Sequence, residues 1–279
     1  MTEAEKKLIY GKKVLFFTQD NQLISAIKTR LIEMEYEIYI LNNIKIIKNV
    51  LSENPESILF ITIDERLTIQ GWNNFIKSIN KDVEFNTTHI GLLTGKISND
   101  KMTMLKSGLN LDAGCEQIEQ DSEDTIRHIV KTLDKLNAKG VRQYVRASCI
   151  TDKSTEIFWL DGDKMRRFQL VDISTVGLAI QFEDKHYPIL QGMKLIPNAK
   201  LALKSKQIPI SLDIQIVKKA GNGYIMVGMF PLEVKGSSIS IIREYVFSRL
   251  HELLMEQIAG RRPDETNYNN VVLSADPTL

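Results

Sequence analysis

The chain has 279 residues, a formal net charge of +1 at neutral pH, and contents of 43% hydrophobic and 25% charged residues. This length suits two domains, and the balanced charge argues against a general role in binding nucleic acid polymers or membrane surfaces. The sequence contains no apolar run of about 18 residues, so no membrane-spanning helix is predicted, and the N-terminal residues lack the apolar core of a signal peptide. A cytoplasmic protein is therefore expected. Cys115 and Cys149 fall in different predicted domains and suggest no disulfide framework.

Residues 1–138 alternate predicted strands and helices. Apolar or β-branched runs predict buried parallel strands, and apolar residues at helical spacing predict the helices between them. The predicted strands are 14–18, 37–41, 58–63, 89–93 and 115–118, and the predicted helices lie around 23–34, 44–51, 72–79, 101–109 and 122–136. Gly140 is expected to end the last helix. This pattern predicts an α/β domain with a five-stranded parallel sheet and flanking helices.

The order and spacing of these elements resemble the receiver domain of two-component signalling. Phosphoryl chemistry in that family needs acidic metal ligands after the first strand, an aspartate after the third, a hydroxyl after the fourth and a lysine after the fifth. Asp64 and Thr94 match, but Gln19 replaces one acid beside Asp20, and residues 116–120 hold no lysine. Because both a metal ligand and a cation are lost, we predict a pseudo-receiver. A phosphorylatable response regulator is the alternative.

A predicted linker, residues 139–147, carries Arg142 and Arg146. From residue 148 the hydrophobic pattern changes to a period of two, and turn signals such as Pro197-Asn198 separate six predicted strands, at 157–160, 167–171, 177–182, 194–196, 212–217 and 224–229. Six short antiparallel strands predict a small all-β barrel. An amphipathic helix ends this second domain, residues 148–259; it is expected to pack on the barrel, with a homodimer seam as the alternative. Residues 260–279 are predicted to be a flexible tail.

Five residues in this half suit a ligand that carries both phosphates and guanine edges. The planar guanidinium groups of Arg142 and Arg146 match phosphate oxygens and the O6 and N7 acceptors of guanine. The carboxylate of Asp172 accepts hydrogen bonds and suits the N1 and N2 donors of guanine, and Ser174 can donate or accept. Gly177 permits a backbone conformation or a close ligand approach that a Cβ would block.

The sequence resembles the PilZ domain over roughly residues 140–258. The resemblance lies in an RxxxR motif that is followed by a DxSxxG motif, a barrel and a final helix. The PilZ family binds the bacterial second messenger cyclic di-GMP. The resemblance implies that Arg142 and Arg146 clamp the ligand, while Asp172, Ser174 and Gly177 hold a guanine at the barrel surface. It implies a signalling effector that is not an enzyme, has no cofactor, and acts on an unknown downstream protein through domain reorientation.

Plainer interpretations of the same residues remain open. The arginines can be solvated charges at a helix end, Asp172 and Ser174 local turn hydrogen-bonders, and Gly177 a source of positive φ. In that case the chain is an interaction adaptor that binds no nucleotide.

Other candidates are weaker. The four histidines have no metal-ligand spacing, so no metal site is predicted. A basic cluster, Lys164, Arg166 and Arg167, is expected to be a solvated strand edge, with a secondary contact to ligand phosphates as the alternative.

Overall fold

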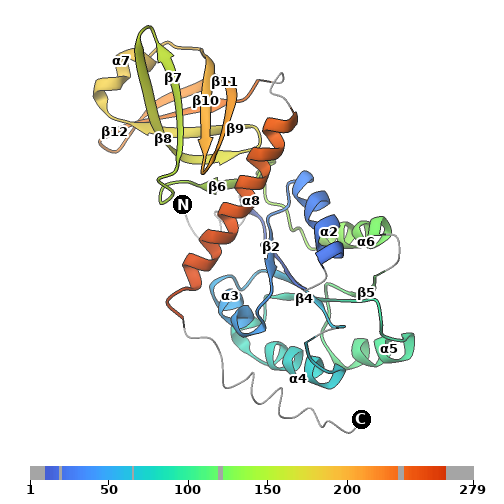
Figure 1. Cartoon of the computed structure of the whole chain (residues 1–279). Helices are drawn as coiled ribbons and strands as arrows, with labels where there is room; N and C mark the ends of the chain where they lie inside the picture. The colour runs from blue at the N-terminus through green and yellow to red at the C-terminus, as the bar shows by residue number, and fades with distance from the viewer. Residues whose placement is uncertain (1–9, 19–20, 65, 119–121, 232–235, 262–279) are drawn as a thin grey trace. The chain divides into compact units, whose positions relative to one another are not determined.

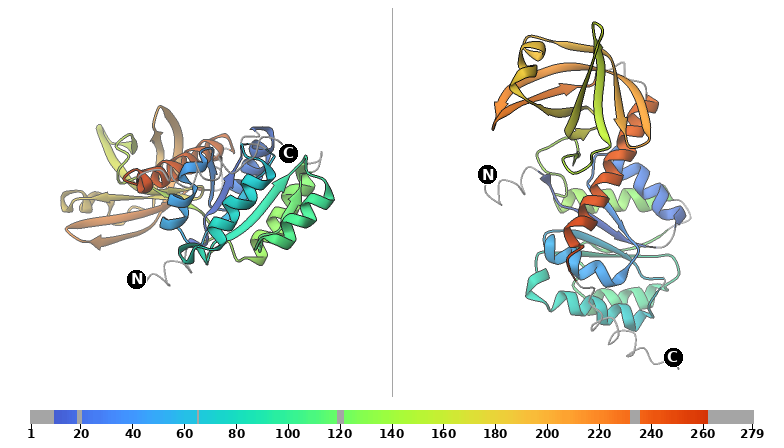
Figure 2. Two further views of the ribbon diagram at one scale, coloured as in Figure 1. Left: turned by 90° about the horizontal axis from the view of Figure 1, so that it is seen from below. Right: turned by 60° about the vertical axis from the view of Figure 1, so that its left-hand side comes forward.

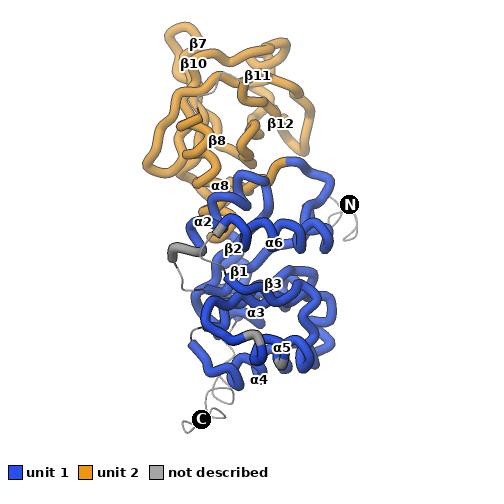
Figure 3. The backbone as a smooth tube through the Cα atoms, turned by 90° about the vertical axis from the view of Figure 1, so that its right-hand side faces the viewer, with its two compact units in different colours: residues 1–143, 253–279 blue, residues 144–252 orange. Residues whose placement is uncertain are grey.

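The computed structural model describes residues 10–18, 21–64, 66–118, 122–231 and 236–261. The chain forms two compact units, residues 1–143 with 253–279, and residues 144–252 (Figure 3). Gln19, Asp20 and the predicted tail from residue 262 onward lie outside the described residues. Among the described helices, none combines the length and hydropathy that crossing a bilayer requires.

The first unit is built on a parallel sheet with the strand order β2-β1-β3-β4-β5 (Figure 1). Its strands are β1 (Val14–Phe17), β2 (Ile38–Leu41), β3 (Ile58–Thr62), β4 (His89–Thr94) and β5 (Cys115–Gln117). Its helices are α2 (Asn21–Glu33), α3 (Ile47–Glu53), α4 (Ile69–Asn80), α5 (Asn99–Gly108) and α6 (Ser122–Lys135), with 3-10 turns at Ile44–Ile46 and Val83–Phe85. This strand order is that of the doubly wound receiver fold, so the predicted α/β class is confirmed.

Continuous apolar runs form the central strands because both faces of the sheet are covered by helices. Figures 1 and 2 show helices on either side of the sheet, with α2 and α6 lying next to each other. Phe16 and Phe60 stack within the sheet layer, with ring centroids 5.2 Å apart, and Trp72 of α4 is fully buried against Phe17 at 5.5 Å. Burial on both faces explains the absence of alternation in these strands.

The prediction that Gly140 ends the last helix of this unit is wrong. α6 ends at Lys135, and Asn137 takes the left-handed conformation with φ of 51°. The Ala138 amide then donates to the Leu133 carbonyl at 2.9 Å, which satisfies a carbonyl that the last turn leaves open. Asparagine therefore does here what glycine was expected to do, because its short polar side chain tolerates positive φ.

The second unit is a closed antiparallel barrel. Its strands are β6 (Arg146–Ser148), β7 (Thr155–Asp161), β8 (Lys164–Ser174), β9 (Gly177–Phe182), β10 (Leu195–Leu203), β11 (Lys206–Ala220) and β12 (Gly223–Met229). Pairing runs β8-β7-β10-β11-β12-β9, and β9 returns to β8, so six strands close the barrel while β6 adds to the free edge of β8. A 3-10 turn (Asp184–His186) and α7 (Tyr187–Leu190) follow β9, and α8 (Gly236–Ile258) follows β12. The predicted six-stranded barrel with a C-terminal helix is confirmed.

Two strands are longer than predicted, because the turn chemistry between them was misassigned. Pro197 and Asn198 lie inside β10 at a register shift, where Asn198 has a φ of 53°, and they do not end the strand. A bulge accepts proline because it leaves an unpaired position in the ladder. The real turn is at Lys204-Ser205, where Lys204 takes a φ of 55° without any glycine or asparagine to signal it.

Candidate functional site

Three of the five predicted ligand residues form a row across adjacent strands at one end of the barrel. Arg146 of β6 lies opposite Ser174 of β8, and Ser174 lies opposite Gly177 of β9. Directly opposed residues of an antiparallel ladder share one face, and Asp172 lies on that face because it is two residues from Ser174 in the same strand. The Arg146 guanidinium and the Asp172 carboxylate are 3.7 Å apart. Residues separated in sequence therefore converge on one patch.

Ser174 and Gly177 maintain the backbone of this patch. The Ser174 hydroxyl donates to the Gly177 carbonyl at 3.2 Å and accepts from the Val176 amide at 3.4 Å, and the side chain is only 2% exposed. A Cβ on Gly177 would stand 2.4 Å from the carbonyl oxygen of Gly228 in β12. Gly177 does not have a positive φ. Close strand approach, and not turn conformation, is therefore the reason for glycine.

Arg146 and Asp172 carry the accessible charge of the patch. Their side chains are 38% and 31% exposed, and a separation of 3.7 Å makes their ion pair loose. Exposed pairs of this kind contribute little to stability, because water and salt screen them. A polar ligand can therefore replace part of this contact at small cost, and the patch presents a forked donor next to an acceptor.

Arg142 belongs to the first unit, whose boundary with the second falls between Gln143 and Tyr144. It is exposed, and its guanidinium lies over the ring of Tyr10, 4.3 Å from the centroid. The chain just before it is held by a hydrogen bond of 2.8 Å from the Lys12 amide to the Ala138 carbonyl. Sequence reasoning missed the contact with Tyr10, because no local pattern connects positions so far apart in the chain.

A buried arginine that sequence reasoning also missed fixes the chain that leaves β6. Arg249 of α8 is 3% exposed; its Nε donates to the Ser148 carbonyl at 3.2 Å, and its other nitrogens reach Thr151 and, at 3.0 Å, Glu252. Burial acts to raise the pKa of Glu252, but hydrogen bonds from Lys204 and Arg249 outweigh it and lower that pKa. The arginine interrupts the apolar stripe of α8, and this interruption was the available signal.

Next to it, Cys149, Asp152 and Tyr245 form a second buried link between α8 and the same segment. The Tyr245 hydroxyl donates to Asp152 at 2.8 Å and lies 3.5 Å from the Cys149 sulfur. Burial raises the pKa of the Cys149 thiol to about 11 and raises the pKa of Tyr245 well beyond its usual value. Burial also acts to raise the pKa of Asp152, yet hydrogen bonds from Ser154 and Tyr245 lower it overall. These contacts link α8 to the segment that directly follows β6.

In the first unit, the matched receiver positions Asp64 and Thr94 are in contact. The Thr94 hydroxyl donates to one oxygen of Asp64 at 2.5 Å, and the Gly95 amide donates to the other at 2.6 Å. Thr94 is fully buried. Both oxygens of the carboxylate therefore join the ends of β3 and β4. Within the described ranges, no group of three or more metal-binding side chains is arranged to hold an ion.

The basic cluster of β8 is largely paired. Arg166 makes an ion pair with Asp161 at 2.9 Å, and Arg167 pairs with Glu156 while its guanidinium lies 4.5 Å from the Phe158 ring centroid. Because each of these arginines already has an acidic partner on the neighbouring strand, the cluster fits a solvated strand surface.

The sequence matches no protein-family model and no curated protein. It is similar to several solved structures. The PilZ domain of YcgR from Escherichia coli with c-di-GMP matches at 17% identity and a TM-score of 0.37, over 43% of this chain and 98% of that chain. The K. pneumonia MrkH–c-di-GMP complex matches at 19% identity and a TM-score of 0.32, over 43% of this chain and little more than half, 55%, of that chain.

A response regulator from Desulfuromonas acetoxidans matches at 11% identity and a TM-score of 0.36, over 45% of this chain and 98% of that chain. The similar structures include a PilZ domain and a response regulator.

Proposed function

We propose that this chain is a cyclic di-GMP effector, in which a pseudo-receiver domain is joined to a PilZ-type barrel by an arginine-bearing linker. The observation that carries the proposal is the row formed by Arg146, Ser174 and Gly177 with Asp172 beside it. The side chains that can contact a ligand there are a guanidinium and a carboxylate, both partly exposed. This pair of groups is complementary to a phosphorylated guanine nucleotide.

The two exposed charges have different roles in the proposed complex. The guanidinium of Arg146 donates to phosphate oxygens or to O6 and N7 of guanine, in two parallel hydrogen bonds. The Asp172 carboxylate only accepts, so it receives the N1 and N2 protons on the opposite edge of the base. Arg142 supplies the second cation and exchanges its contact with the Tyr10 ring for ligand. Ser174 and Gly177 keep the strands at the spacing that this geometry requires.

Ligand binding is proposed to reorient the domains, taken as 1–138 and 148–259 with the linker 139–147. The unit boundary falls after Gln143, so one arginine of the pair precedes it and the other follows it. A dianion held by both arginines constrains the intervening residues, and it shifts the arrangement of the domains only by its difference in affinity between arrangements. Small-angle scattering with and without cyclic di-GMP measures this directly, and identical curves at saturation refute the reorientation.

Calorimetric titration of cyclic di-GMP into the full chain tests binding itself. An Arg142→Ala/Arg146→Ala variant is expected to lose the binding heat, because each lost charge-assisted contact costs about 1.5–3 kcal/mol. The matched control is Arg30→Ala/Arg127→Ala, which removes the same charge from two exposed helical positions. No heat with a folded wild-type chain, or equal loss in both double variants, overturns the proposal and favours the protein-interaction adaptor.

Phosphorylation of Asp64 defines the remaining alternative, a phosphorylatable response regulator. Both oxygens of Asp64 accept hydrogen bonds, from Thr94 and Gly95, so the carboxylate is oriented and occupied as it stands. This arrangement supports a structural carboxylate in a non-enzymatic effector.

A further inference from the structure

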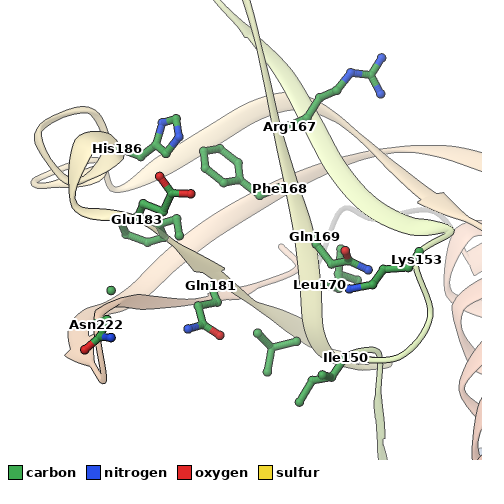
Figure 4. A pocket seen from close by; sticks show the side chains of 13 residues that line it. Ile150, Lys153, Arg167, Phe168, Gln169, Leu170, Gln181, Glu183, His186 and Asn222 are labelled. Carbon is green, nitrogen blue, oxygen red and sulfur yellow. The ribbon is translucent and has the colours of Figure 1, made fainter.

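A groove opens on the barrel where β8 and β9 stop pairing. Within the described part of the chain, the β8–β9 register extends no further than Leu170 opposite Ile180. Beyond this point β8 pairs only with β7, and β9 pairs only with β12. Figure 4 shows the two strands diverging. The pocket lined by this region has a volume of about 540 Å³, which is typical of ligand sites. Each strand therefore presents an edge whose backbone groups have no strand partner on that side.

The groove has an apolar floor and amide-bearing walls. Phe168 and Phe182 form the floor of the groove and are only 7% and 5% exposed. They can contact the side chains of an occupant, but neither ring has an exposed face on which a nucleotide base could stack. Gln169 stands on one strand and Gln181 on the other (Figure 4). The Gln169 side chain donates one N–H to the Asp152 carbonyl at 2.7 Å. Gln181 pairs with Ile225 through the β9–β12 ladder, and its side chain makes no hydrogen bond to any described residue. A carboxamide carries the same donor and acceptor as a peptide group, so two of them flanking a groove suit a main chain.

Charge in the groove is positive at one end. Lys153 is exposed and forms no ion pair with the described residues, and Figure 4 places it beside Gln169 and Leu170. The only acid that lines the described groove, Glu183, pairs with Lys185 at 2.7 Å. The surplus charge therefore favours an occupant that carries a carboxylate near Lys153.

We propose that this groove binds an extended acidic peptide segment of a partner protein by adding a strand between β8 and β9. Beyond the last β8–β9 pair, the β8 residues that line the groove are Arg167 to Gln169, about 10 Å of strand, so the groove takes an extended segment of about three residues. Alternate side chains of such a segment point down onto the phenylalanine floor and up toward solvent, and an acidic residue meets Lys153. This inference does not depend on the proposed binding of cyclic di-GMP, because it uses none of the five residues that are proposed to bind that ligand.

The test is selection of a random linear heptapeptide library on phage against the full chain, followed by fluorescence anisotropy of the enriched peptides. Gln181→Trp fills the groove and is expected to weaken binding at least about tenfold, as is Lys153→Glu. The matched controls are Gln207→Trp and Lys200→Glu, at exposed positions of β11 and β10 outside the groove, and they are expected to leave affinity unchanged.

Methylation of alternate backbone nitrogens in the peptide removes the hydrogen-bond donors of one edge of the added strand. It therefore lowers the affinity of a peptide that binds by strand addition, and not that of a peptide that binds through its side chains alone. Enriched acidic peptides that lose affinity on methylation and with both groove variants support the proposal. Failure to enrich any peptide, preference for basic peptides, or equal affinity for Gln181→Trp and Gln207→Trp overturns it. Circular dichroism of each variant establishes that the chain remains folded.

Discussion

Replacing Gly177 with alanine tests whether the motif glycine is needed by the barrel itself. The added Cβ would lie 2.4 Å from the Gly228 carbonyl oxygen and 3.2 Å from the Cα of Met229, whereas real Cβ atoms keep at least 3.0 Å. This Cβ–oxygen distance must therefore grow by about 0.6 Å (3.0 minus 2.4 Å), so the backbone must shift at Gly177. Gly177 is held between Ser174 and Met229 in a closed barrel, which cannot open at this point without disturbing both ladders. We expect Gly177→Ala to lower the free energy of unfolding by about 1–3 kcal/mol, the usual cost of overpacking.

Urea titration followed by tryptophan fluorescence measures this effect. The chain has two tryptophans, Trp72 in the first unit and Trp159 in the barrel, so a Trp72→Phe background makes the signal report on the barrel. The control is Gly236→Ala at the start of α8, where a Cβ has no neighbour within 4 Å. It is expected to change stability by less than about 1 kcal/mol. An unchanged midpoint in Gly177→Ala, with an unchanged slope, would refute the argument from strand approach.

Four further predictions concern groups around the two sites. Arg249→Met should lower the unfolding free energy of the barrel by about 1.5–3 kcal/mol in the same titration, because the Ser148 carbonyl loses a charged donor; an unaltered midpoint contradicts this. Burial raises the pKa of Cys149 to about 11 from the ordinary 9.0. The thiol of the unfolded chain therefore ionises first as the pH rises, so the stability that the buried neutral thiol contributes is complete below pH 9 and is lost between pH 9 and about 11. Cys149→Ala should therefore flatten that alkaline decline, and a decline of the same steepness would argue against it. Thr94→Val should destabilise the first unit by about 1 kcal/mol, followed through its own tryptophan. Acetyl phosphate with Mg²⁺ should leave Asp64 unmodified by mass spectrometry, and a stoichiometric adduct would restore the response-regulator interpretation.

Much of the fold could be predicted because hydrophobic periodicity reports burial directly. The unbroken run Ile58–Thr62 and the sequence from Gly177 to Phe182 lie in strands with the predicted bounds or nearly so. The predictions failed where a residue other than glycine takes a positive φ. Asn137 ended a helix in place of Gly140, and Lys204 made a turn that carried no sequence signal. Positive φ at asparagine or lysine depends on the surrounding tertiary contacts, which a local pattern does not contain.

The sequence grouped the residues of the candidate site, but it did not indicate how their structural roles are divided. Spacing alone grouped Asp172, Ser174 and Gly177, and the structure places Arg146 in the same row. It also assigns Arg146 to a strand, although the sequence indicated a linker. The supporting arginine, Arg249, was missed because a charge within an apolar stripe looks like an exposed position until the opposing carbonyl of Ser148 is known.

The buried hydroxyl of Ser174 has a consequence for tracing the proposed nucleotide binding among related sequences. Its two hydrogen bonds close the turn that leads to Gly177, so a barrel that had lost every ligand would still select for serine and glycine at these positions. Retention of SxxG therefore records descent and foldability. The partly exposed charges of Arg142, Arg146 and Asp172 are the groups proposed to contact the ligand, so substitutions at these positions should distinguish related barrels that bind nucleotide from those that do not.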